Sequence, residues 1–142
     1  MNNTYYETLD ENFNMALELL SKPVSHNELI NLLRTGNIAQ RQAAALRLET
    51  LQSEDDANIL ISNLTGQDGK IREAVSLKIK EFMSNPQLLV YFENTSSYDI
   101  FLDAIIDINA NICRNIIEAV SNLKNNPEFS KSKQTSNEVK NE

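Results

Sequence analysis

The stretch ILISNLTGQDGKIREAVSLKIKEF, residues 59–82, decides the fold. Its first part places Ile59, Leu60, Ile61 and Leu64 on one stripe of a helix. Its last part repeats apolar residues at steps of three and four, at Ile71, Ala74, Val75, Ile79 and Phe82. That spacing is helical, so the stretch predicts two helices joined by a short turn.

The turn between these helices is predicted at residues 65–69. Gly66 and Gly69 can adopt positive φ at little cost, which suits a helix end and a tight turn. Asp68 can cap the second helix by accepting a hydrogen bond from an exposed backbone N–H.

The same pattern occurs once upstream, in residues 29–51, and once downstream, in residues 101–123. Anchoring the three copies on Gln40, Ile71 and Ile112 gives steps of 31 and 41 residues along the chain. This alignment brings together Leu29, Leu60 and Phe101, then Ile30, Ile61 and Leu102, then Leu33, Leu64 and Ile105. Such steps are typical of helical solenoids, and three copies are the minimum for a stable array.

The second helix of the central copy, IREAVSLKIKEF, resembles the second helix of a HEAT repeat. In that family a branched apolar residue and an Arg precede two small residues, and Leu follows at the next turns. The matching residues are Ile71, Arg72, Ala74, Val75 and Ile79, and in the first copy Arg41, Ala43, Ala44, Leu48 and Leu51. The third copy departs at Cys113 and Asn115, while Asp107 keeps the acidic turn residue. The resemblance covers about residues 27–124 and implies an all-α fold, a short α-solenoid of three HEAT-like hairpins.

The segments outside the repeats define the expected domain organisation. Residues 1–10 are predicted to be a flexible N-terminus, residues 11–124 the solenoid domain and residues 125–142 a disordered tail with little apolar content. Phe13, Met15, Ala16, Leu19 and Leu20 predict an amphipathic helix that Pro23 terminates. This helix is interpreted as a cap on the first hairpin.

Local signals predict the remaining elements. Ser25 and Glu28 form a capping box that opens the first helix, Gly36 closes it, and the Ala-rich second helix is expected to reach about Gln52. Between the second and third copies, residues 84–97 predict one short helix with Pro86 in its first turn. This insertion explains the longer second step.

Composition limits the function. The chain has 142 residues, which suits one domain, and a net charge of −7, which disfavours nucleic acid or an anionic membrane as the main partner. It has no apolar run near the ~18 residues of a membrane span and no secretory leader pattern. A single cysteine agrees with a reducing compartment. The chain is therefore expected in the cytoplasm.

Catalytic and metal-binding patterns are weak. His26 is the sole histidine and is interpreted as an exposed first-turn residue, and Cys113 as a partly buried thiol. Asp99, Asp103 and Asp107 share a helical face and could bind a cation or act as acid and base. They are interpreted instead as a solvated face, with Asp107 bonding turn N–H groups or Arg72. The prediction is a non-enzyme without catalytic residues, cofactor or metal.

The charges of the second helices suggest a binding face. Residues 38–52, 69–83 and 110–124 contain Arg41, Arg47, Lys70, Arg72, Lys78, Lys80, Arg114 and Lys124 against Glu49, Glu73, Glu81 and Glu118. In HEAT-like solenoids these helices line the concave side, which could steer an acidic protein surface. Candidate partner-binding residues are Arg41, Arg72, Lys80 and Arg114, with Tyr91 and Phe92 of the insertion as an aromatic contact. With equal weight, these bases could instead pair with acids of neighbouring first helices and produce no exposed field.

The C-terminal hairpin has no capping segment in the sequence. Ile116, Val120 and Leu123 are expected to be exposed on its outer side. This predicts self-association or a bound neighbour at that end.

The leading functional hypothesis is a non-catalytic scaffold or adaptor that binds another protein through the concave face. The resemblance implies an alternative, because small bacterial HEAT proteins include the phycobiliprotein lyase and phycobilisome-degradation group, and AQRQAAALRLETL looks like their repeats. No residue here fixes a bilin-handling role. A HEAT-like DNA repair glycosylase is a remote third hypothesis, because such an enzyme needs a basic, aromatic cleft and this chain has no Trp.

Overall fold

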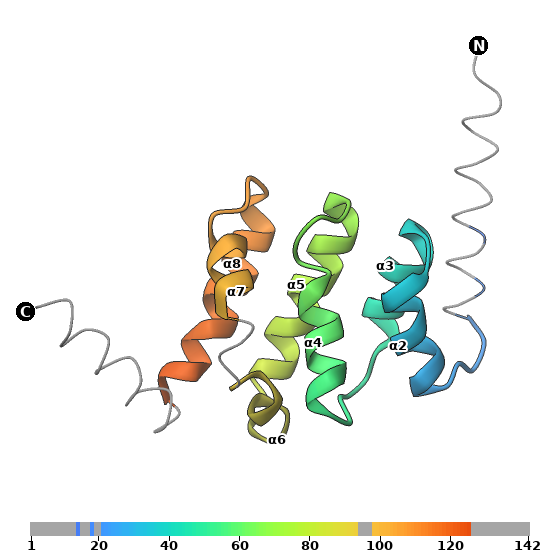
Figure 1. Ribbon diagram of the computed structural model, residues 1–142, viewed down its shortest axis with the longest axis horizontal. Coiled ribbons are helices and arrows are strands. Elements are labelled where there is room, and N and C mark those ends of the chain that lie inside the picture. Colours follow the sequence, from blue (N-terminus) through green and yellow to red (C-terminus); the bar gives the residue numbers. More distant parts are fainter. Residues whose placement is uncertain (1–13, 15–17, 19–20, 94–97, 126–142) are drawn as a thin grey trace, which may run out of the picture.

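Three helix pairs follow one another along the chain, in a computed structural model that describes residues 14, 18, 21–93 and 98–125. The pairs are α2 (His26–Thr35) with α3 (Ile38–Arg47), α4 (Glu54–Ser62) with α5 (Gly69–Met83), and α7 (Tyr98–Ile105) with α8 (Ala110–Ser121). The pairs lie side by side in a row, with α2, α4 and α7 on the near side (Figure 1). The described residues form helices and connecting segments and no strand, which confirms the all-α prediction.

Side-chain caps start the long helices where the sequence places short polar residues. In each case the cap side chain accepts a hydrogen bond from a backbone N–H of the first turn. The capping residues are Ser25 for α2, Asn37 for α3, Ser53 for α4, Asp68 for α5 and Asn109 for α8. The predicted cap at Asp68 is confirmed. Ser25 caps α2 as predicted, but the reciprocal capping box forms between Asn37 and Gln40 at α3 and not between Ser25 and Glu28. Gly66 has φ of 70° in the turn before α5.

The predicted short helix is present in the insertion between the second and third pairs, whose residues 94–97 lie outside the described part of the chain. Pro86 opens the short helix α6 (Pro86–Leu89), and the 3₁₀ turn η1 (Val90–Phe92) continues from it. Leu88 and Leu89 pack against the core, and Phe92 is part of it. The described part of the insertion therefore fills space beside the second pair, where α6 contacts α5 and η1 contacts α4.

One continuous apolar core runs through the three pairs. Helix α3 packs against α5, and α5 packs against α8, so the second helices form the longest line of contact. Fully buried residues come from every pair, among them Leu33, Leu48, Ile61, Ile79 and Ile116. Burying such side chains stabilises the fold by about 1.5–3 kcal/mol each.

Two element predictions are wrong. Helix α3 ends at Arg47 and not near Gln52, because Leu48 takes an extended conformation. The extended segment lets both Leu48 and Leu51 enter the core. Gly69 is the first residue of α5 and does not have positive φ, so only Gly66 uses the glycine freedom of this turn.

Two further predictions fall where the structure describes little or nothing. The predicted N-terminal helix at 11–21 is described only at Asn14, Glu18 and Ser21. The flexible N-terminus at 1–10 and residues 126–142 of the tail lie outside the described residues. The capping role and the two terminal segments stay predictions.

Candidate functional site

Arg41 of α3 ties the first helix pair to the second. Its Nε donates to Gly36 O at 2.7 Å and its Nη1 to Leu33 O at 3.1 Å, which satisfies carbonyl groups at the end of α2. Nη1 also donates to Asn63 Oδ1 of the next pair at 2.9 Å. Asn63 is buried and donates in turn to Leu33 O at 3.0 Å. The guanidinium is therefore a bridge between neighbouring hairpins.

Arg72 of α5 makes the equivalent bridge between the second hairpin and the third. Its Nη1 donates to Gln67 O at 2.7 Å, and Gln67 is the residue that the alignment places with Gly36. Its Nε and Nη2 donate to the two carboxylate oxygens of Asp107 at 2.9 and 3.2 Å, and Asp107 also accepts from Asn109 N at 2.9 Å. The prediction for Asp107 is confirmed on both counts.

This ion pair shifts the protonation of both partners. The hydrogen bonds from Arg72, helped by the Asn109 N–H, hold the pKa of Asp107 below its usual range against the opposing effect of burial. The same contact with Asp107 raises the pKa of Arg72. Both groups are therefore charged at neutral pH, and the pair joins the second hairpin to the third.

A ladder of polar contacts runs between α5 and α8. Asn111 Nδ2 donates to Glu73 Oε1 at 2.7 Å, and Asn115 Nδ2 donates to Ser76 Oγ at 3.1 Å. One turn further, Lys80 Nζ lies 3.4 Å from Glu118 Oε2. Side chains at 111, 115 and 118 therefore face back toward the preceding hairpin.

The six predicted partner-binding residues fall into different environments. Arg41 and Arg72 are half-buried in the bridges described above, and Lys80 pairs with Glu118. Phe92 is 2% exposed and packs in the core, and Tyr91 is half-buried beside it. Arg114 is exposed on α8. The structure does not gather the six residues into one surface, and partner binding through them stays a prediction.

The internal ion pairs bear on the predicted basic field. Lys78 Nζ lies 3.1 Å from Glu81 Oε2 and 5.6 Å from the centroid of the Phe82 ring. Together with Arg72 and Lys80, this residue directs its charge toward groups of the same chain. The arrangement favours internal pairing over a broad positive field on the second helices. The acids that pair with Lys78 and Lys80 belong to second helices, and not to neighbouring first helices as predicted.

An apolar surface feature on the second helices was missed by the sequence reasoning. Leu46 on α3 is 43% exposed and Leu77 on α5 is 36% exposed. The alignment places the two leucines at the same repeat position, and α3 packs against α5. The sequence does contain two leucines 31 residues apart, at the same position of two repeats. Periodicity alone could not show whether that position is exposed or part of the core.

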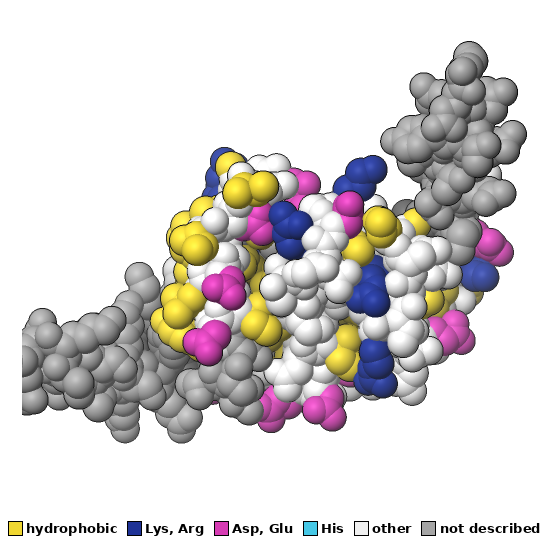
Figure 2. All heavy atoms as spheres, turned by 45° about the horizontal axis from the view of Figure 1, so that its top comes forward, with side chains coloured by type: hydrophobic (Ala, Val, Ile, Leu, Met, Phe, Trp, Pro, Cys, Tyr) yellow, Lys and Arg dark blue, Asp and Glu magenta, His cyan; other side chains and the backbone are white. Residues whose placement is uncertain are grey.

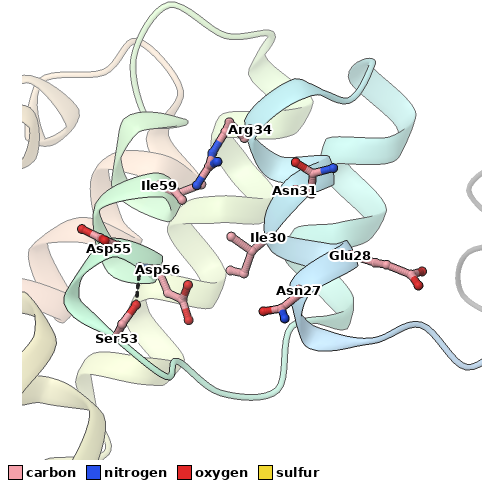
Figure 3. A pocket seen from close by; sticks show the side chains of 9 residues that line it. All are labelled: Asn27, Glu28, Ile30, Asn31, Arg34, Ser53, Asp55, Asp56 and Ile59. Atoms are coloured by element: carbon pink, nitrogen blue, oxygen red, sulfur yellow. Dashed lines mark hydrogen bonds between the residues drawn. The ribbon is translucent and has the colours of Figure 1, made fainter.

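A shallow groove of about 530 Å³ lies between α2 and α4. Its lining residues are Asn27, Glu28, Ile30, Asn31, Arg34, Ser53, Asp55, Asp56 and Ile59. Figure 3 shows Glu28 and Asp55 pointing in opposite directions, while Arg34 points across the groove toward Ile59. The charged groups therefore do not converge on one ligand position, and we do not propose a binding site in this groove.

His26 is not the exposed residue that the sequence suggested. Its Nε2 lies 2.7 Å from Asp56 Oδ2, and both side chains are largely buried. Asp56 also accepts from Gln52 N at 2.9 Å, which fixes the entry to α4. The pair joins the first hairpin to the second, so the contact made by His26 is a structural one.

Other candidate chemical groups are structural or solvated. Cys113 is half-buried, as predicted, and its Sγ contacts Ile105 O at 2.6 Å. Asp99 and Asp103 are exposed on α7. Among the described residues, no group of three or more His, Cys, Asp or Glu side chains could hold a metal ion.

The outer side of the last hairpin differs from the prediction. Ile116 and Leu123 are buried and Val120 is half-buried, so these three residues are not the exposed ones. The buried side of α8 packs against α5 and α7, and the side that carries Ile117 is exposed. Among the described residues of this hairpin, the exposed large apolar side chains are Leu102 on α7, Ile106 and Ile108 in the turn, and Ile117 on α8.

A scan against protein-family models, a search of curated proteins and a search of solved structures each gave no match for this chain. The HEAT resemblance and the bilin-handling alternative therefore stay predictions. None of the helices in the described part of the chain combines the length and apolar content that crossing a bilayer requires.

Proposed function

We propose that this protein is a non-catalytic adaptor, a short α-solenoid of three HEAT-like hairpins that binds a partner protein through its second helices. Support for the repeat comes from contacts that recur at aligned positions. Arg41 and Arg72 donate to the aligned carbonyls of Gly36 and Gln67. Cys113, which replaces the Arg in the third copy, contacts Ile105 O, the carbonyl aligned with Leu33 O.

The observation that carries the binding role is the exposure of Leu46 and Leu77. The two leucines are exposed at the same repeat position on helices α3 and α5, which pack against each other. Solenoids build extended surfaces from such repeated positions. Exposed apolar groups with polar neighbours are also typical of protein-binding sites. Since several bases are paired inside the chain, apolar contact is expected to supply more of the affinity than charge.

A capture experiment tests this function. The tagged protein serves as bait in an extract of its native source, alongside the variant L46E/L77E and the control V90E. Val90 is 56% exposed and lies on η1, which packs against α4 and α6 and does not belong to either second helix that carries the leucines. The expected result is a partner that the wild type and V90E retain and L46E/L77E loses, with all three proteins equally folded by circular dichroism. Equal capture by L46E/L77E would contradict the role of this surface.

A further inference from the structure

The outward side of the third hairpin is an apolar face with charges of both signs. We call it the end face, and it consists of Asp99, Leu102, Asp103, Ile106, Arg114 and Ile117. Leu102 is 46% exposed, Ile106 78% and Ile117 49%. Figure 2 shows hydrophobic side chains gathered over the end of the molecule formed by α7 and α8, with acidic side chains among them.

Two apolar residues of the end face, Leu102 and Ile117, occupy positions that are buried in the other two hairpins. Leu102 aligns with Ile30 and Ile61, which are 7% and 0% exposed. Ile117 aligns with Ala45 and Ser76, which are both fully buried. In the first two hairpins the next hairpin packs against these helices, as α2 contacts α4, α3 contacts α5 and α5 contacts α8. The third hairpin therefore ends in a packing face that lacks its cover among the described residues.

The end face does not repeat the chemistry of the internal junction. At the junction of α5 with α8, polar contacts are made from Arg72, Glu73, Ser76 and Lys80. The aligned residues of the third hairpin are Cys113, Arg114, Ile117 and Ser121. Ile117 replaces the serine at the middle of the face, and Arg114 replaces the glutamate. The end face is thus more apolar and carries its positive charge on α8.

We propose that the end face binds the end face of a second copy of this chain, in a two-fold symmetric dimer. The face is self-complementary in charge, because α7 contributes Asp99 and Asp103 while α8 contributes Arg114. A two-fold axis running along the helices places α7 of one protomer against α8 of its partner. Such an isologous contact closes on itself and forms each charge pair twice.

The level of these charges along the helices fits this arrangement. Helix α7 ends at Ile105 and α8 begins at Ala110 after a short turn, so the two helices run antiparallel. Counted from the turn, Arg114 lies between the levels of Asp103 and Asp99. An arginine can therefore reach either carboxylate of the partner. By the same count, Leu102 lies near the level of Arg114, and Ile117 lies near the level of Asp99.

The opposite end of the molecule is closed at the two positions that match Asn111 and Asn115. Asn111 and Asn115 face the preceding hairpin, and their aligned residues in the first hairpin are Ala39 and Ala43. These alanines are 8% and 2% exposed. A head-to-tail chain of copies would need that surface open, so the geometry favours the two-fold pair.

Sedimentation of the full chain over a concentration series tests the proposal. The expected result is a concentration-dependent rise toward twice the chain mass of 16.1 kDa. The variant L102E is expected to sediment as a single chain, because it buries a charge beside Asp99 and Asp103, while the control V90E behaves as wild type. Wild type that stays at the mass of one chain throughout would overturn the proposal.

A charge exchange separates this contact from loss of folding. The variants R114E and D99K/D103K each place like charges opposite each other, and each is expected to weaken self-association about tenfold or more. An equal mixture of the two restores opposite charges at both symmetric positions and should dimerise again. A mixture no tighter than the separate variants would overturn the two-fold geometry. The variant L46E/L77E should dimerise as wild type, so this result is independent of the proposed adaptor surface.

Discussion

At the scale of single residues, two arginines hold successive hairpins together. Arg41 and Arg72 each satisfy a carbonyl after the first helix of their own hairpin and then reach a polar side chain of the next hairpin. The partner is a neutral amide at Asn63 and a carboxylate at Asp107. The sequence allowed the Arg72 contact to be predicted because Asp107 is the family-like turn residue. The contact between Arg41 and Asn63 could not be predicted, because an asparagine in a helical pattern can cap a helix, face solvent or bind another side chain.

Replacing Asp107 tests the stronger of these bridges. D107N keeps the size of the side chain but removes the charge, and it is expected to lower the free energy of unfolding by about 1–2 kcal/mol. The estimate is at the low end for a charged hydrogen bond because Arg72 retains some contact with water. Urea unfolding measures the effect. The control is E49Q on the exposed segment after α3, with an expected change within about 0.5 kcal/mol.

The same variant predicts a pH dependence. Because the folded protein lowers the pKa of Asp107, the stability from its carboxylate is fully present above the ordinary aspartate pKa of about 3.9 and is lost as pH falls through the lower folded value. The difference between wild type and D107N should therefore stay constant from pH 7 to 5 and shrink below pH 4. A difference that disappears above pH 5 would refute the assignment.

At the scale of elements, helix starts were predictable and one helix end was not. Ser25, Asp68 and Pro86 begin helices in the structure because each supplies a local cap or a fixed φ. The end of α3 is set by tertiary packing, since Leu48 and Leu51 both reach the core only when the chain leaves the helix. No residue near Arg47 is of a type that would predict a helix end there.

Two glycines of one turn should respond in opposite ways to alanine. Gly66 has φ of 70°, so G66A is expected to destabilise the fold by about 1 kcal/mol. Gly69 begins α5, and an added Cβ would meet nothing within 4 Å, so G69A is expected to stabilise it by about 0.5 kcal/mol. Thermal unfolding of both variants measures the contrast. Equal effects of the same sign would show that the turn differs from this description.

At the scale of the whole molecule, the repeat steps of 31 and 41 residues gave the order of the hairpins and the place of the insertion. They could not give the outward stripe of the last hairpin, because α8 has apolar residues on more than one side. Ile116 turns inward and Ile117 outward, and only packing against α5 and α7 decides between them. The exposed leucines at 46 and 77 escaped prediction for the same reason.

The central claim is that three hairpins stack in a row, so that the second helices form a surface. Spin labels at the aligned positions 46, 77 and 118, introduced in pairs as L46C, L77C and E118C on a C113S background, test it most directly. Neighbouring second helices pack about 8–10 Å apart, so the labels at 46 and 77, and those at 77 and 118, should show short distances. The account predicts a distance near 20 Å between 46 and 118, about twice the helix spacing. A 46 to 118 distance as short as the other two would indicate a closed bundle and contradict the account.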